Sequence, residues 1–355
     1  MRYWFLAIAL LVSDVTAQSV HAMPVGIANV PAMAQASDVI VVGRATLTQN
    51  PNAPFLVTAD RVLKGVIGAS RRLVIVPPPR TWQDYYSSVR ERQYGIFFLR
   101  RHPGGSTYTV TDPFHPALVA SPRPAANQPV FTDVLSSVAQ ELTGVLAAPA
   151  ATLTDPVTGV QDSMTAPAYP AQGVYYEAAT ALKTIPYAVA GPPLDAIAAS
   201  NQVPARLWAM YSLFSMSGSA DDSAKTDYLQ SVTPILVNPE PGLAPTASIL
   251  GSAIEGHLKS PAAVPTLVAL LGSTQVSVRR AAAYVLRDIA TPDVVAPLAN
   301  VALNDSDEDV RHYAVLGLAE VTRVAAAPSI PTFRQKQDEI LHFWRAWSRA
   351  NVRGP

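Results

Sequence analysis

The sequence predicts an α+β protein in which a small N-terminal β-barrel or sandwich is followed by a C-terminal α-helical solenoid. Two observations lead to this fold class. Short apolar runs separated by turn residues occupy the segment from Ser37 to about Ser121. From Gly173 onwards the apolar spacing becomes helical, and near the C-terminus it repeats every 32 residues. Short apolar runs are typical of strands, and a repeated helical period is typical of stacked helical pairs.

The five strands are expected at Val39–Leu47, Phe55–Leu63, Leu73–Val76, Tyr94–Leu99 and Tyr108–Thr111. Turn-forming or pairing-breaking residues separate these runs, at Asn50-Pro51, Lys64-Gly65, Pro77–Pro79 and Pro103–Gly105. Five short strands predict a small barrel or sandwich. A following amphipathic helix is expected at Phe131–Leu146, because its valines and leucines recur every three or four residues.

The repeat becomes visible when Pro265 is aligned with Pro297. The alignment places Val278, Arg279, Ala282, Leu286 and Ile289 on Val310, Arg311, Ala314, Leu318 and Val321. The apolar members of each set share one helical face. A weaker copy surrounds Arg206, and the segment Ala244–Gly256 is a further candidate without the arginine. We therefore expect two clear repeats and two degenerate ones.

These repeats resemble the second helix of HEAT repeats, and the resemblance implies a solenoid that binds other proteins. The strand segments "SDVIVVGRATL", "VTADRVLKG", "RRLVIV" and "QYGIFFLRR" resemble bacterial secreted domains with an OB-like or netrin/TIMP-like barrel. In TIMP-type inhibitors a terminal cysteine approaches the protease metal. This chain has no cysteine, so that mechanism does not carry over.

The N-terminus has the order of a secretory signal peptide, with Arg2, the apolar run Tyr3–Val12 and small residues ending at Ala17 or Ala22. The run is far shorter than the ~20 residues that cross a bilayer as a helix, and no later segment is long enough. We expect export to the periplasm or the exterior. The expected segments are a signal peptide (1–22), a β-domain with its helix (23–146), a linker (147–172), helical repeats (173–327) and a capping helix (328–355).

Composition and motifs argue against several function classes. Lys and Arg number 26, as do Asp and Glu, so the chain as a whole does not attract nucleic acid or anionic membranes. The lack of cysteine excludes disulfides, thiolate metal sites and a cysteine nucleophile. No GxSxG, GxxxxGK[ST], HExxH or GxGxxG motif is present. We expect no enzyme activity, no cofactor and no metal.

Three groups of residues invite a functional interpretation. Asp305, Asp307 and Asp309 alternate as in a calcium loop, but Val310 and Leu316 stand where Gly and Glu are needed, so we expect helix capping. Arg279 and Arg311 are candidates for anion binding, but their recurrence favours a structural bond to a neighbouring turn. The scattered histidines, which include His102, His115, His257, His312 and His342, have no metal-binding spacing.

The helix near the C-terminus carries Ile340, Phe343, Trp344 and Trp347 on one stripe, which predicts a closing helix over the end of the stack. The sequence as a whole predicts an exported, non-catalytic protein that binds a protein partner, with Arg280, Arg287, His312 and Tyr313 as candidate contact residues. Two alternatives remain open. One is an enzyme accessory or bilin lyase-like protein with a pocket between the domains, and the other is a hydrolase inhibitor acting through the barrel.

Overall fold

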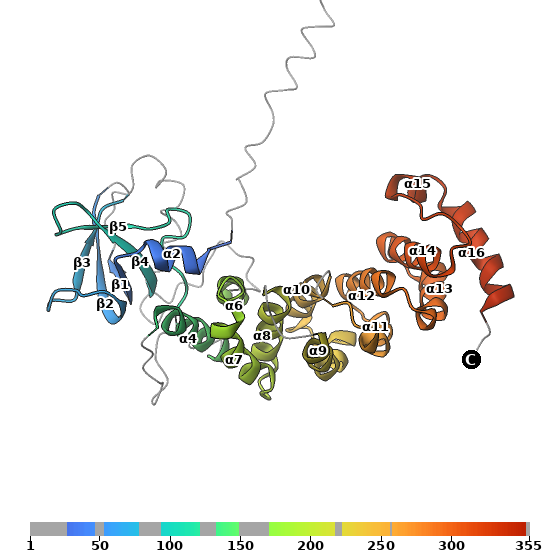
Figure 1. The fold of residues 1–355 in the computed structure, drawn as a ribbon, viewed down its shortest axis with the longest axis horizontal. Helices are drawn as coiled ribbons and strands as arrows, with labels where there is room; N and C mark the ends of the chain where they lie inside the picture. The colour runs from blue at the N-terminus through green and yellow to red at the C-terminus, as the bar shows by residue number, and fades with distance from the viewer. Residues whose placement is uncertain are drawn as a thin grey trace, which may run out of the picture.

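The computed structural model describes residues 27–46, 53–77, 94–120, 133–148, 170–216, 222–255 and 258–352. A β-barrel lies at one end of the molecule, and a row of α-helices extends from it to the C-terminus (Figure 1). The predicted fold class is confirmed. The predicted signal peptide and most of the predicted linker lie outside the described residues.

Five strands close the barrel in the order β1-β2-β3-β5-β4. All neighbouring strands are antiparallel except β3 and β5, which pair in parallel through Ile75 and Tyr108. The strands are β1 (Val39–Thr46), β2 (Phe55–Lys64), β3 (Arg72–Ile75), β4 (Tyr94–Arg101) and β5 (Tyr108–Val110), and the short helix α2 (Val30–Ala36) precedes them. All five predicted strands are present, with ends that differ by one or two residues.

Strand β1 is buried on both faces, which explains its uninterrupted apolar sequence. Its side chains Val39 and Val41 point into the barrel interior. The alternate side chains Ile40 and Val42 belong to a second core that continues into the helices. Strand β4 follows the same rule, with Phe97 and Leu99 in the barrel interior and Ile96 and Phe98 in the shared core. The barrel therefore has its own core and also shares one with the helical stack.

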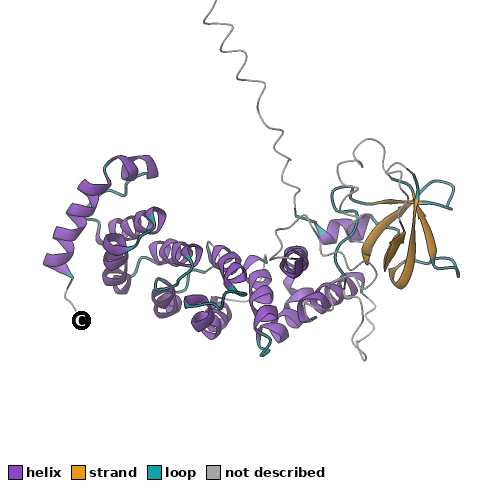
Figure 2. Ribbon diagram, turned by 180° about the vertical axis from the view of Figure 1, so that it is seen from behind, coloured by secondary structure: helices purple, strands orange, loops and turns teal. Residues whose placement is uncertain are grey.

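The helical part consists of successive antiparallel pairs, which Figure 2 shows from behind. Helices α8, α10, α12 and α14 contact one another in sequence, and α7, α11 and α13 each pack on the helix that follows. The bounds are α4 (Val134–Ala147), α6 (Pro170–Leu182), α7 (Tyr187–Ala198), α8 (Val203–Ser215), α9 (Asp222–Val237), α10 (Ala244–Ile254), α11 (Val264–Leu270), α12 (Val276–Ile289), α13 (Val295–Asn304), α14 (Glu308–Thr322), α15 (Ile330–Gln335) and α16 (Gln337–Asn351). None of these helices is long and apolar enough to span a membrane.

Helix α4 joins the barrel to the stack. It packs on α6 and α7 and also contacts β2. At the contact with β2, the Arg61 guanidinium donates from Nε and Nη2 to the two carboxylate oxygens of Glu141, at 2.7 and 2.6 Å. A second link runs from the Val119 backbone N–H to Glu177 Oε1, at 3.0 Å. The helix that the sequence assigns to the β-domain is therefore also the first helix of the stack.

The C-terminal stripe is only partly buried. Trp344 is fully buried, and Ile340 and Trp347 pack partly against the same core. The expectation that Phe343 shares this face is wrong, because its side chain is 41% exposed. Its ring touches Trp344 edge-on, with ring centroids 5.2 Å apart.

Candidate functional site

Arg279 and Arg311 are structural residues, as their recurrence predicts. The Arg279 guanidinium donates to both carboxylate oxygens of Asp305, at 2.8 and 3.1 Å, and to the Ser273 carbonyl at 2.9 Å. Arg311 repeats this pattern one unit later, because it donates to the Asp305 carbonyl at 2.8 Å. With the Gln337 amide turned to satisfy its neighbours, its oxygen accepts from Arg311 Nη2 at 2.7 Å. Both guanidinium groups thus bond within the stack.

The acidic turn before α14 acts as a helix cap, which confirms the prediction for Asp307. Its carboxylate accepts a hydrogen bond from the Val310 backbone N–H at 3.0 Å, and it also accepts two bonds from Arg280, at 2.8 and 2.7 Å. These bonds lower the pKa of Asp307 to about 2, although burial opposes the shift. Asp305 accepts from the Asp307 backbone N–H at 2.8 Å and so fixes the turn itself.

Three of the four candidate contact residues lie together on α12 and α14. The Arg287 guanidinium lies over the Tyr284 ring, 4.1 Å from its centroid, and 6.0 Å from the centroid of Tyr313. The two tyrosine rings meet edge-to-face at 5.3 Å. Arg280 lies nearby, with 40% of its side chain exposed and its Nη2 3.3 Å from Asp309. We name Glu255, Arg280, Tyr284, Arg287, Asp309 and Tyr313 the α10–α14 patch.

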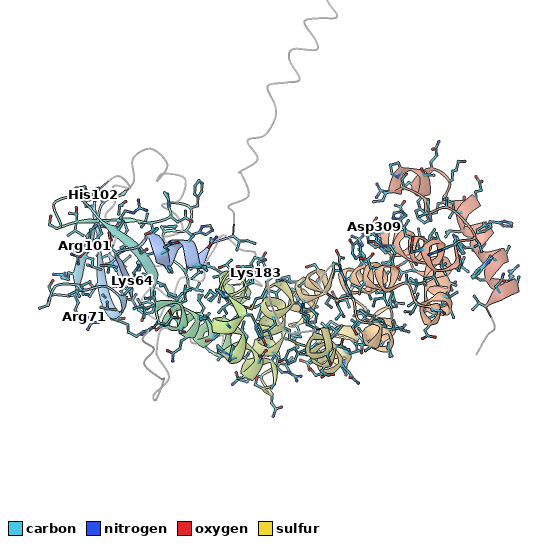
Figure 3. The ribbon with its side chains drawn as sticks, viewed as in Figure 1. Lys64, Arg71, Arg101, His102, Lys183 and Asp309 are labelled. Carbon is cyan, nitrogen blue, oxygen red and sulfur yellow. The ribbon has the colours of Figure 1, made fainter. Side chains whose placement is uncertain are left out.

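Glu255 directly follows α10 and is the acidic residue of the patch on the α10 side, opposite Asp309 of α14. Burial raises the pKa of its carboxyl, although the guanidinium groups of Arg280 and Arg287 lower it. The patch therefore combines two partly buried aromatic rings with charges of both signs. Figure 3 shows Asp309 on the side of the stack from which α15 rises. Sequence reasoning missed Glu255 and Tyr284, which carry no motif and come together only when neighbouring helices pack.

His312 is not a surface residue, so the expectation that it contacts a partner is wrong. It is only 4% exposed, its Nε2 lies 3.0 Å from the Pro328 carbonyl, and its ring centroid is 5.1 Å from that of Phe333. The segment leading into α15 runs back along α14 and covers this position near the start of the helix. In the preceding repeat the corresponding position is Arg280, whose side chain is 40% exposed.

A second cluster of aromatic rings lies between α6 and α8. Tyr176, Trp208 and Tyr211 lie with their ring centroids 5.8 to 6.1 Å apart, and Tyr176 is 44% exposed. Lys183 Nζ lies 3.4 Å from the Tyr211 hydroxyl and 5.4 Å from its ring centroid. Burial lowers the pKa of this lysine. The ammonium is stabilised by the aromatic ring and the hydroxyl, and no carboxylate in the described ranges pairs with it.

In the part of the chain that the structure describes, no group of three His, Asp or Glu side chains is placed to hold a metal ion. His115 Nδ1 lies 2.8 Å from the Asp112 carboxylate. Burial raises the pKa of Asp112, but the bonds from His115 and from the Phe114 backbone N–H outweigh it and lower that pKa. The pair fixes the loop after β5. His257 lies outside the described residues.

Comparison with known proteins identifies the repeats. Residues 246–319, from α10 into α14, match the family model of HEAT repeats. Two solved structures, both crystal structures of engineered proteins from the Northeast Structural Genomics Consortium, are similar to part of the chain. The first is 16% identical, over 55% of this chain and 95% of the other, with a TM-score of 0.32. The second is 21% identical, over 54% and 92%, with a TM-score of 0.31. No curated protein matches the chain.

Proposed function

We propose that this chain is an exported, non-catalytic protein that holds a protein partner on the α10–α14 patch of its HEAT-repeat solenoid. The observation that carries the proposal is the stacked arrangement of Tyr284, Arg287 and Tyr313 at a partly exposed position. Tyrosine and arginine are among the residue types that most often dominate binding energy at protein interfaces. Rings held in place by packing lose little conformational entropy when a partner binds.

The position of the patch in the stack supports the same proposal. It crosses the row formed by α10, α12 and α14, and helical repeats use such rows as extended binding surfaces. Arg280 is anchored by Asp307 and Asp309, so its remaining N–H groups are presented in a fixed direction. The acidic residues Glu255 and Asp309 at its margins would select a partner with complementary charges.

Export and the nature of the barrel belong to the proposal as well. Export rests on Arg2, the apolar run Tyr3–Val12 and the small residues up to Ala22, all of which lie outside the described residues. The strand order and the parallel β3–β5 pair support an OB-like barrel. Amino-terminal sequencing of the protein recovered from culture fractions tests export, and a retained Met1 would contradict it.

The two alternatives receive less support from the geometry. An inhibitor of the proposed kind would use an exposed barrel edge, and the five described strands form a closed barrel. A pocket between the domains would need open space at the contact between barrel and helices. That contact contains the buried side chains Ile40, Phe98 and Val138, which belong to one continuous core.

The test is affinity capture with the chain from Met23, followed by measurement of the dissociation constant for the captured partner. The double variant Arg287→Ala/Tyr313→Ala removes the centre of the patch. Since each interface arginine or tyrosine of this kind contributes on the order of 1–2 kcal/mol, we expect binding to weaken at least about tenfold.

The matched control is Phe343→Ala/Arg349→Ala, which removes an exposed ring and a charge from α16. Circular dichroism must show both variants folded. Equal affinity of the patch variant and the control would place the partner elsewhere. If a small molecule stabilises the chain against heat and no protein is retained, a pocket and an enzyme-related role replace this proposal.

A further inference from the structure

The neutral total charge conceals a separation of charge along the chain. Residues 27–120 contain ten Lys and Arg against five Asp and Glu, whereas residues 133–355 contain fourteen against twenty. The barrel region is therefore basic and the helical region acidic. The overall balance, which argues against a basic binding surface, does not describe the barrel.

The strand topology gathers the basic side chains at one end of the barrel. Strand β2 ends at Lys64 and β4 ends at Arg101, and these antiparallel neighbours of β1 both end beside its first residues. Because β3 runs antiparallel to β2, it starts at the end of the barrel towards which β2 runs. The basic end, as we call it, comprises Lys64, Arg71, Arg72, Arg100 and Arg101.

Three of these cations bind backbone carbonyls, so their positive charge is not neutralised. Lys64 Nζ donates to the Ala34 and Ser37 carbonyls, at 2.8 and 2.6 Å. Arg71 Nε donates to the Ala59 carbonyl at 2.8 Å, and Arg101 Nη2 donates to the Val66 carbonyl at 2.6 Å. Two acidic residues also lie here: the Asp38 carboxylate accepts from the Arg101 backbone N–H at 2.8 Å, and the Asp60 backbone carbonyl accepts from Arg71 Nη2. Figure 3 shows Lys64, Arg71, Arg101 and His102 on the barrel.

Arg72 and Arg100 are exposed, and neither side chain has a hydrogen-bond or ion-pair partner within the described ranges. Between the cations, the loop from β2 to β3 presents Val66, which is 78% exposed. The loop is held in this position because Arg101 binds the Val66 carbonyl and Ile67 packs on the barrel core. The basic end therefore carries an exposed aliphatic side chain on a loop that Arg101 holds in place.

We propose that the basic end of the barrel attaches the protein to an anionic phospholipid surface. Lys and Arg near such a surface are attracted by its negative potential, and an aliphatic tip adds apolar contact at the boundary between headgroups and acyl chains. Nucleic-acid surfaces generally add exposed aromatic rings for base stacking. Among the described residues of this end, Tyr108 is buried beneath Arg101, and Val66 is the most exposed large apolar side chain. An acidic peptide would not account for the projecting valine.

The expected strength follows from the number of charges. Each basic residue near an anionic membrane contributes about 1 kcal/mol at moderate salt, which corresponds to roughly fivefold in affinity. Removal of Arg72 and Arg100 should therefore weaken binding by about tenfold or more. Attachment should also weaken as salt is added, because surface charges are screened over about 8 Å at physiological ionic strength.

The test is vesicle flotation with the chain from Met23, so that the apolar run Tyr3–Val12 contributes nothing. Vesicles of phosphatidylcholine mixed with phosphatidylglycerol are compared with vesicles of phosphatidylcholine alone. We expect the chain to float with the anionic vesicles, Arg72→Gln/Arg100→Gln to lose about tenfold, and Val66→Ser to lose severalfold. The control Arg345→Gln/Arg349→Gln, with the same change of charge on α16, should bind as the parent does.

Three outcomes would overturn the inference. The first is equal flotation with both kinds of vesicle, and the second is an equal loss in the barrel and α16 variants. The third is binding to polyglutamate or duplex DNA with no vesicle binding, which would make the basic end a site for a soluble polyanion. Thermal unfolding of each variant separates loss of binding from loss of fold.

Discussion

At the residue scale, neighbouring arginines have different roles for reasons that the sequence reveals only in part. Arg279 recurs as Arg311 at the next repeat, and this recurrence correctly predicts a structural bond. Arg280 recurs as His312, and nothing in the spacing distinguishes the exposed arginine from the buried histidine. The difference arises because the segment leading into α15 covers only the last repeat. The patch residues were predictable as positions on a helix, but their exposure depended on how the stack ends.

The first prediction concerns Asp307, which caps α14 and pairs with Arg280. Asp307→Ala should lower the free energy of unfolding by about 1–2 kcal/mol, because one cap and one charged hydrogen-bond pair are lost together. Urea denaturation measures this change. Asp293→Ala, in a short 3-10 turn and with no side-chain cap bond at that turn, is the control and should change stability by less than about 0.5 kcal/mol.

The same residue has a definite pH dependence. Its folded-state pKa, about 2, lies below the ordinary value of 3.8, so its stabilising contribution is complete above pH 3.8. The contribution should be lost as pH falls from about 4 towards 2. The stability difference between the parent and Asp307→Ala should shrink over this range. A difference that stays constant in acid would show that the carboxylate charge does not stabilise the turn.

At the element scale, periodicity located the strands and helices, but it did not determine how the strands pair. The lengths of β1 and β4 were predictable from their apolar runs. These runs are uninterrupted because each strand contributes one face to the barrel interior and the other to the core shared with the helices. The parallel β3–β5 pair was not predictable, since it depends on contacts between segments more than 30 residues apart. The helix α4 was located correctly. Its contact with the stack was not evident, because an apolar helix face does not indicate which element packs against it.

The second prediction tests the close approach of β1 and β2 at Gly43. An added Cβ would meet the Thr58 carbonyl oxygen and would lie 2.9 Å from the Ala59 Cα, and backbone atoms cannot move aside as a side chain can. Gly43→Ala should therefore destabilise the barrel by about 2 kcal/mol or more. The control is Gly68→Ala, where no atom lies within 4 Å. Equal stability of the two variants would contradict the close approach.

At the scale of the whole molecule, the barrel and the stack are one structural unit. One apolar core runs from the outer face of the barrel through the helices to Trp344. The Arg61–Glu141 pair lies at the contact, with side chains only 20% and 7% exposed. Such continuity favours cooperative unfolding over independent unfolding of two domains.

The third prediction follows from that continuity. Calorimetry of the parent protein should show one unfolding transition, and Arg61→Ala should lower stability by about 3 kcal/mol because it leaves the Glu141 carboxylate buried without its partner. The control Arg334→Ala removes a more exposed pair with Glu308, worth about 1 kcal/mol or less. Two separated transitions in the parent would show that the shared core does not couple the barrel to the helices.

The arginine bonds of the repeats also give the stack a direction. Arg279 and Arg311 each bind a carbonyl six residues earlier in their own unit and a side chain of the following unit, Asp305 and Gln337 respectively. Each of these two units is thus completed by its successor, and α16 completes the second. Removing α16 would leave the Arg311 guanidinium without its side-chain acceptor. In the same way, a unit inserted into the stack must supply a side-chain acceptor for the arginine of the unit before it.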